Sequence, residues 1–210
     1  MVAADPATLT ADALRDELVL EDGVVSGADW SGAEVDDVVI SSCRLERVVL
    51  TGALLNRLKL TDVEFVDCEL SGVMFSRLSA RRLTFRMCRM SSLVMTNAGL
   101  ADVQFRDCKL DEANFRMTKG ERVAFDDSVL SGADFYQADL PGSRFIRCDL
   151  RRAEFSKAKL AGSALHGSEL ADVRGARALS GATITSAQAI PVGLLLLREL
   201  DITVDDDAIL

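Results

Sequence analysis

The chain has 210 residues and a formal net charge of −9, and 49% of its residues are apolar although only 5% are aromatic. This length suits one domain with small appendages, and the apolar content excludes an intrinsically disordered chain. No apolar run reaches the roughly 18 residues that a membrane-spanning helix needs. His166 is the only histidine, which excludes most catalytic arrangements that depend on imidazole.

Residues 1–23 are predicted to cap one end of the molecule. Thr10 is suited to N-cap a short helix that runs through Leu18, and Trp30 is expected to plug the first coil behind this cap. The first residues lack a basic segment followed by an apolar one, so no secretory signal is predicted. The five cysteines lack close Cys-x-x-Cys pairs, which favours reduced thiols in a cytoplasmic protein.

Residues 24–175 repeat with a period of five. Every fifth residue from Trp30 to Leu170 is large and apolar, except Ala80 and Gly120, and all nine phenylalanines belong to this series. The residue two positions before each of them is Ala, Val, Cys, Leu, Ser or Thr, and all five cysteines occupy that second series. Neither a helix, with period 3.6, nor a flat strand, with period 2, produces this pattern.

The spacing of two between the small and the large residue predicts a short extended segment with both side chains facing one way. The next two residues then turn the chain, and four such segments close one square coil. A second period of 20 supports this interpretation, because Phe65, Phe85, Phe105, Phe125 and Phe145 form one column. Cys68, Cys88, Cys108 and Cys148 form another column, with Ser128 in the gap.

These residues resemble the pentapeptide-repeat family, whose motif is A-(D/N)-L-x-x. Ala133-Asp134-Phe135 and Ala138-Asp139-Leu140 carry the motif, and the resemblance covers roughly residues 24–175. It implies an all-β fold, a right-handed quadrilateral parallel β-helix. We expect about seven coils, stacked about 4.8 Å apart, with short capping helices at both termini.

Residues 176–210 are predicted to form a C-terminal cap and a dimerisation module. The period of five slips after Val173 and returns in a shifted phase at Leu179 and Ile184. The segment 192–200 is predicted to be a helix that is apolar all round and therefore needs cover on more than one side. Ile202 and Val204 are expected to continue as a small strand. This tail resembles the C-terminal module of Qnr-type and MfpA-type members. The predicted dimerisation residues are Leu194, Leu195, Leu196, Leu197, Leu200 and Ile202, and the alternative is a monomeric cap.

No catalytic, metal-binding or cofactor-binding residue is predicted, and the chain is expected not to be an enzyme. The cysteine column is interpreted as core filler, because Ala, Val and Ser serve at equivalent positions. His166 follows an inward residue and is expected to point outward. Paired acids such as Asp36-Asp37 and Asp126-Asp127 are interpreted as solvated corners. Gly120, where the large residue is missing, is expected to produce a local bend or a void instead of a site. Gly120 with Lys119 and Glu121 is nevertheless the place to look for a functional irregularity.

The charges are distributed unevenly along the repeats. Residues 24–175 hold 21 basic and 22 acidic residues, and residues 24–69 hold 4 basic and 9 acidic ones. Residues 70–101 hold five arginines and no acid, which predicts a ring of positive charge that we call the arginine belt. The predicted partner surface consists of this belt and the only tyrosine: Arg77, Arg81, Arg82, Arg86, Arg89 and Tyr136.

Two functions remain open at this stage. The first is a scaffold that binds a protein partner whose identity the sequence does not reveal. The second, implied by the resemblance, is a DNA mimic that binds DNA gyrase and is linked to resistance to quinolones or other gyrase inhibitors. The nearly neutral repeat region and its basic centre depart from that pattern. The acidic total argues against direct binding of nucleic acid.

Overall fold

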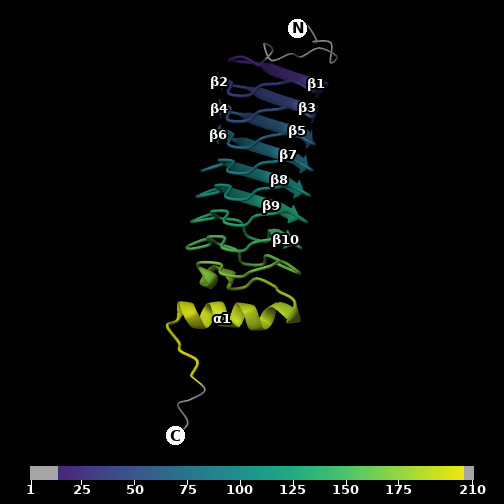
Figure 1. Cartoon of the computed structure of the whole chain (residues 1–210). Helices are drawn as coiled ribbons and strands as arrows, with labels where there is room; N and C mark the ends of the chain where they lie inside the picture. Colours follow the sequence, from purple (N-terminus) through teal and green to yellow (C-terminus); the bar gives the residue numbers. More distant parts are fainter. Residues whose placement is uncertain (1–13, 206–210) are drawn as a thin grey trace.

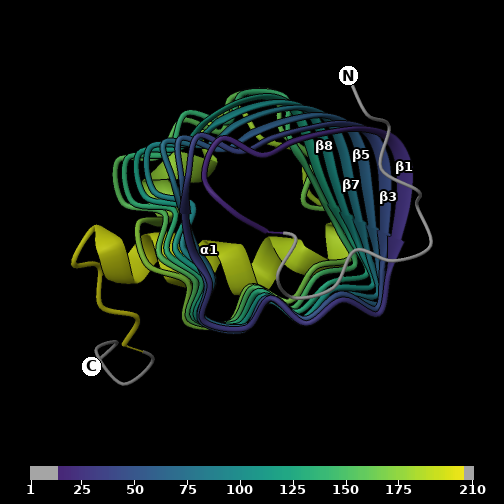
Figure 2. The ribbon, with the colours of Figure 1, turned by 90° about the horizontal axis from the view of Figure 1, so that it is seen from above.

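A computed structural model describes residues 14–205. The chain winds into coils that stack along one axis, with β1 at one end and α1 beneath the last coil (Figure 1). Seen along the axis, each coil has a roughly square outline (Figure 2). Each residue pairs with the residue 20 positions later, as in Val39↔Lys59 and Lys59↔Ser79. The predicted quadrilateral parallel β-helix is confirmed.

The corners of the coils explain the period of five. Every fifth residue from Glu17 to Asp172 has a φ between 50° and 75°, in the left-handed region. Most of these corner residues are not glycine, and none is β-branched, which agrees with the steric cost of this conformation for branched side chains. The backbone N–H of many corner residues is bonded to the next coil, as where Arg57 donates to the carbonyl of Ser76 at 2.9 Å. Stacking thus satisfies the backbone at these turns.

The strands form two parallel sheets. One has the order β1-β3-β5-β7-β8-β9-β10 and the other β2-β4-β6. The long strands bend at a central corner residue such as Asp62, so each contributes to two adjoining walls. The strand bounds are β1 Val19–Ser26, β2 Glu34–Asp36, β3 Val39–Glu46, β4 Leu54–Asn56, β5 Lys59–Val66, β6 Met74–Ser76, β7 Ser79–Arg86, β8 Gly99–Arg106, β9 Lys119–Asp126 and β10 Arg144–Ile146.

We number the four walls by the large inward residues of one coil. The first wall contains Leu60, the second Phe65, the third Leu70 and the fourth Phe75, and every residue 20 positions away belongs to the same wall. The first wall therefore faces the third across the core. The outward side chains are the two neighbours of each large inward residue and the corner residue that follows them, so every wall carries three columns of them.

The core is a ladder of aromatic rings. On the second wall, successive rings from Phe65 to Phe145 stack with centroids 4.7–5.0 Å apart. On the fourth wall, Phe115, Phe135 and Phe155 stack in the same way and meet the first column edge-on at 5.6–5.9 Å. Both arrangements are favourable geometries for aromatic pairs. The two aromatic columns of the sequence thus become the packed interior.

Of the bend or the void expected at Gly120, the void in the core is not found among the described residues. A Cβ placed on Gly120 would lie 2.5 Å from Cγ2 of Val123 and 2.6 Å from Cδ2 of Leu140. The side chains of the neighbouring positions have therefore moved into the space of the missing one. The adjacent Thr118 is fully buried and donates its hydroxyl to the carbonyl of Met95 at 2.7 Å.

The N-terminal end differs from the predicted helical cap. Thr10 lies outside the described residues, and residues 14–18 form a turn instead of the end of a helix. Leu14 and Leu18 are buried on the core, and β1 already pairs with β3 from Val19 onward. Strand pairing therefore begins before residue 24, where the repeat is first recognisable in the sequence. Trp30, only 2% exposed, fills the first coil as predicted.

The C-terminal end follows the predicted slip of phase. Ala164 bridges to Thr183, only 19 positions later, so the last coil is one residue shorter than the others. Two short 3-10 helices, η2 (Ala176–Leu179) and η3 (Ser186–Gln188), lead into α1 (Ala189–Glu199). The helix thus begins at Ala189 instead of Val192. Ile202 and Val204 form no strand, so that prediction is wrong.

Gly175 marks the point where the last coil tightens. It occupies the inward position of the fourth wall, directly after the coil that holds Phe155, and a Cβ on it would lie 2.3 Å from the backbone nitrogen of Ser156. The chain can pass this close only because glycine has no side chain. Gly175 also has a φ of 72°. Glycine here is needed both for conformation and for space.

We predict that Gly175→Ala destabilises the protein much more than Gly142→Ala. Gly142 has a similar φ of 66° but nothing within 4 Å of its hypothetical Cβ. Gly142→Ala should therefore cost only the left-handed conformation, about 1–2 kcal/mol. Gly175→Ala should cost about 1–3 kcal/mol more, because the backbone of Ser156 must move. Chemical denaturation followed by circular dichroism measures both, and equal losses would contradict the close approach.

Candidate functional site

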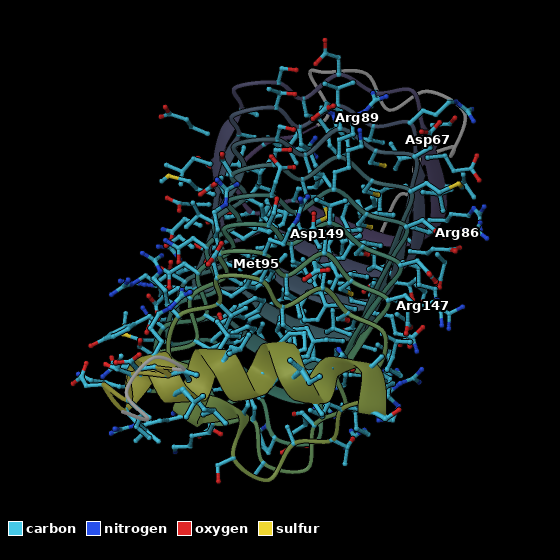
Figure 3. The ribbon with its side chains drawn as sticks, turned by 60° about the horizontal axis from the view of Figure 1, so that its bottom comes forward. Asp67, Arg86, Arg89, Met95, Arg147 and Asp149 are labelled. Carbon is cyan, nitrogen blue, oxygen red and sulfur yellow. The ribbon has the colours of Figure 1, made fainter. Side chains whose placement is uncertain are left out.

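The arginine belt encircles the rod. Arg81, Arg82 and Arg86 lie on β7, Arg77 lies at the corner before it, and Arg89 lies on the third wall. In Figure 3, Arg86 points outward, away from the core. The five guanidinium groups therefore reach different sides of the molecule and do not form a single stripe.

Three of the five arginines pair with acids of the preceding coil. Arg82 forms a bidentate pair with Asp62, with Nη2 at 2.6 Å from Oδ2. Arg86 lies 3.7 Å from Glu64, and Arg89 lies 4.0 Å from Glu69. The acid-free stretch of sequence is thus flanked in space by the acids of residues 62–69. The belt is not the ring of unbalanced positive charge that the sequence predicts.

The same pairing recurs along the rod. A cation and an acid that are one full coil apart in the sequence occupy one outward column and therefore meet. We call this set the charge ladder; its members are Arg44–Glu64, Arg57–Asp37, Arg82–Asp62, Arg89–Glu69, Arg106–Asp126, Arg122–Asp102, Arg147–Asp127, Lys159–Asp139 and Arg174–Glu154. The Arg147 guanidinium lowers the pKa of the Asp127 carboxyl through a hydrogen bond. Exposed pairs are individually weak, so the ladder mainly neutralises the surface.

The acidic corners are thus not simply solvated, as the sequence interpretation had it. Asp37 binds Arg57 through two hydrogen bonds of 2.6 and 2.7 Å, and Asp36 lies 3.6 Å from the same guanidinium. Asp127 binds Arg147 in the same two-pronged way, and Figure 3 shows Arg147 on the outer edge of the rod. These carboxylates are occupied by arginine.

Tyr136 is held on the fourth wall between two cations. The Arg116 guanidinium lies 4.3 Å from the ring centroid, and Lys157 donates its ammonium to the phenol oxygen at 2.8 Å. Asp134 fixes Arg116 at 2.8 Å and accepts the backbone N–H of Tyr136. The ring is half-buried and far along the rod from the belt. The two parts of the predicted partner surface therefore do not form one patch.

The cysteines are buried free thiols. In the predicted column, each thiol donates to the carbonyl two residues before it, as Cys108 does to Arg106 at 3.2 Å. Ser128, which fills the gap, donates to Asp126 in the same way at 2.9 Å. Because serine serves in the same place with the same bond, the column acts as core filler. Burial raises the pKa of the Cys148 thiol to about 11.

No grouping of three or more histidine, cysteine or acidic side chains that could hold a metal ion occurs within residues 14–205. His166 is exposed on the second wall, as predicted. No helix in the described part of the chain is both long and apolar enough to cross a membrane.

Gly120, Lys119 and Glu121, the predicted place of an irregularity, line a hollow on the first wall. It lies over β7, β8 and β9 and has a volume of about 490 Å³. The outward residues Gly99 and Ala101 on its floor are small, and Arg81 also lines it. The sequence pattern of inward residues indicated the place, but it did not predict the shape of the hollow, which depends on these outward residues.

The fold and the surface together define a β-solenoid repeat protein whose four walls display side chains in straight columns. The chain belongs to the pentapeptide repeat family: the family described as "Pentapeptide repeat region" matches residues 58–135 and 102–174, which together span more than half of the sequence. A comparison with curated proteins finds no significant sequence match.

Solved structures of this kind are also similar to the chain. One is full-length QnrB1, a plasmid-mediated fluoroquinolone resistance protein, with 19% identity, coverage of 86% of this chain and 99% of QnrB1, and a TM-score of 0.43. Another is HetL, a pentapeptide repeat protein involved in heterocyst differentiation regulation from the cyanobacterium Nostoc sp. strain PCC 7120. It has 15% identity, coverage of 81% of this chain and 91% of HetL, and a TM-score of 0.29.

We predict that the thiols of the folded protein resist modification. The thiolate is the reactive species, and at pH 8 almost none of Cys148 ionises if its pKa is about 11. A colorimetric disulfide reagent should label almost no thiol at pH 8 without denaturant and all five cysteines in denaturant. Rapid labelling of one thiol in the folded protein would contradict the role as core filler.

Proposed function

We propose that this protein is a non-enzymatic scaffold that binds a protein partner through its walls. The observation that carries this proposal is the regular display of outward side chains in columns on four flat walls. Side chains that often perform chemistry are engaged elsewhere: the thiols are buried and many acids belong to the charge ladder. Solenoids of this kind offer long surfaces for binding macromolecules. The free thiols favour a reducing cytoplasm.

The alternative is a DNA mimic that binds DNA gyrase. What favours it is the end of the rod near β1, where Glu21, Asp22 and Glu34 form no ion pair with another described residue. Asp29 is bound only by the neighbouring Ser31, through its hydroxyl and its backbone N–H. Uncompensated carboxylates suit a basic DNA channel. Toward the middle of the rod the charge ladder neutralises the acids, so we rank this alternative second.

We also propose a homodimer through the outer face of α1. Ile190 and Leu194 lie one turn apart and are 76% and 55% exposed, and Leu200 and Ile202 beyond them are about half exposed. Leu195 is buried and Leu196 packs on the chain's own core, so these two predicted dimerisation residues belong to the cap instead. Leu197 is half-buried. An apolar helix face that remains exposed is typical of an interface.

The scaffold function is tested by partner capture with charge-reversed walls. The immobilised protein is compared with Arg81→Glu/Arg82→Glu, which reverses the belt on the first wall, and with Arg89→Glu/Lys109→Glu on the third wall. We expect a partner that the wild type captures and that only one of the two variants captures in an amount at least tenfold lower. Capture that is equal for every variant would contradict binding through a wall. Inhibition of gyrase supercoiling by the purified protein would instead favour the DNA mimic.

The dimer is tested by light scattering. Ile190→Asp/Leu194→Asp should convert a dimer into a monomer, because two carboxylates would enter an apolar interface. Val204→Asp, at a residue that is 66% exposed and lies beyond the helix, is the matched control and should remain dimeric. A wild-type protein that stays monomeric at a concentration on the order of 100 µM would refute the proposal.

A further inference from the structure

The hollow on the first wall combines short side chains with two cations that can bind the carboxylates of a ligand. Neither Arg81 nor Lys119 forms an ion pair with a carboxylate in the described residues, whereas the ladder cations on either side do. The acids nearest to the hollow are engaged by other groups. Asp139 is bound by Lys159 at 2.9 Å, and Glu121 lies 3.6 Å from Arg122. The hollow is therefore lined by two cations without ion pairs in the described residues and by two acids, Glu121 and Asp139, that neighbouring cations engage.

The floor of the hollow is open to a ligand. The outward positions directly between the two cations are Gly99 and Ala101, whose side chains are short. Ser79 and Glu121 occupy the other two corners of this part of the wall. The backbone beneath them is fully paired, because β8 lies between β7 and β9 in the parallel sheet. A ligand cannot add as a further strand here. It must bind through its own side chains.

The spacing of the two cations limits what can bind both. Lys119 occupies the same outward column as Ser79, two coils further along the rod, and Arg81 lies two residues after Ser79 in β7. The Cα atoms of Arg81 and Lys119 are therefore separated by about 10 Å along the rod and about 7 Å across it. The resulting diagonal is about 12 Å. Two side chains four residues apart on an extended peptide point the same way and are separated by about 13 Å. Carboxylates at such positions match the two cations.

We propose that the hollow over β7, β8 and β9 is a docking site for an extended acidic segment of a protein partner. Arg81 and Lys119 each bind one carboxylate, and the intervening side chain of the segment lies over Gly99 and Ala101. A segment with two separated carboxylates suits this lining better than a nucleic acid does, because a continuous polyanion would also meet Glu121 and Asp139, which line the hollow. This inference rests on the proposed scaffold function. It specifies the wall that binds the partner and the acidic character of the bound segment.

The test uses a fluorescent nine-residue peptide with Glu at its third and seventh positions and Thr elsewhere. Fluorescence anisotropy is measured with the full-length protein at low salt. A peptide with Gln in place of both Glu residues is the control for charge, and oligo-dT of similar length is the nucleic-acid probe. We expect the Glu peptide to bind at least tenfold more tightly than either control. No binding of the Glu peptide, or tighter binding of oligo-dT, would overturn the proposal.

Two variants locate the site. Arg81→Glu/Lys119→Glu should weaken binding of the Glu peptide at least tenfold. Arg89→Glu/Lys109→Glu makes the same change of charge on the opposite wall and should bind like the wild type. Gly99→Val fills the floor without changing charge; a Cβ there meets only the carbonyl of Leu78 at 4.0 Å, so the fold tolerates it. It should weaken binding about fivefold or more, and equal binding by all variants would overturn the proposal.

The remaining outcomes separate this inference from the scaffold function. If the Arg81→Glu/Lys119→Glu variant becomes monomeric where the wild type is a dimer, the hollow is a contact between two copies, and the proposal is overturned. In another outcome, Arg89→Glu/Lys109→Glu loses a captured partner, whereas Arg81→Glu/Lys119→Glu still binds the Glu peptide like the wild type. The scaffold function then stands and the inference fails.

Discussion

The left-handed corner residue is the constraint on which the rest of this structure depends. A turn at every fifth residue fixes the length of each wall, and four equal walls make each coil return above its own start. That register stacks the phenylalanine rings and aligns the outward side chains in columns. The conformation is costly for residues such as Asp127 and Arg147, and the hydrogen bonds to neighbouring coils offset that cost. Core, walls and surface chemistry all follow from this one backbone choice.

The register also decides how surface charges meet. Residues that are distant in sequence, such as Arg82 and Asp62, become nearest neighbours, whereas Arg81 and Arg82 face different surroundings. Linear stretches of charge are therefore poor guides to the surface of a solenoid. What distinguishes one part of a wall from another is whether a cation or an acid meets an opposite charge that is not already engaged. Within residues 14–205, the acids near β1 that form no ion pair and the cations Arg81 and Lys119 at the hollow are examples.

The fold could be predicted almost completely from the sequence, because each inward position tolerates few residue types and the pattern recurs many times. Trp30, the cysteine column and the slip after Val173 were all recognisable for this reason. The two ends were predicted less well. Residues 14–18 and residues 202–204 lie outside the repeat, where a short segment carries no periodic signal. The void expected at Gly120 is filled because neighbouring side chains pack into its space, and the periodicity of the sequence does not show such repacking. The arginines of the belt lie on different sides of the rod, as predicted. Their positive charge is partly balanced, because ion pairs join residues of successive coils that are distant in the sequence.

The shortened last coil gives the rod a defined end. A uniform stack of coils would expose a row of unpaired backbone groups, onto which another rod could add end to end. The tight passage at Gly175 and the helix α1 replace that row with a surface that cannot continue the repeat (Figure 1). Above this point, coils are interchangeable units, because removing or duplicating one whole coil preserves every inward column. Such a rod can therefore change in length during evolution by the gain or loss of whole coils, while the same C-terminal cap is retained.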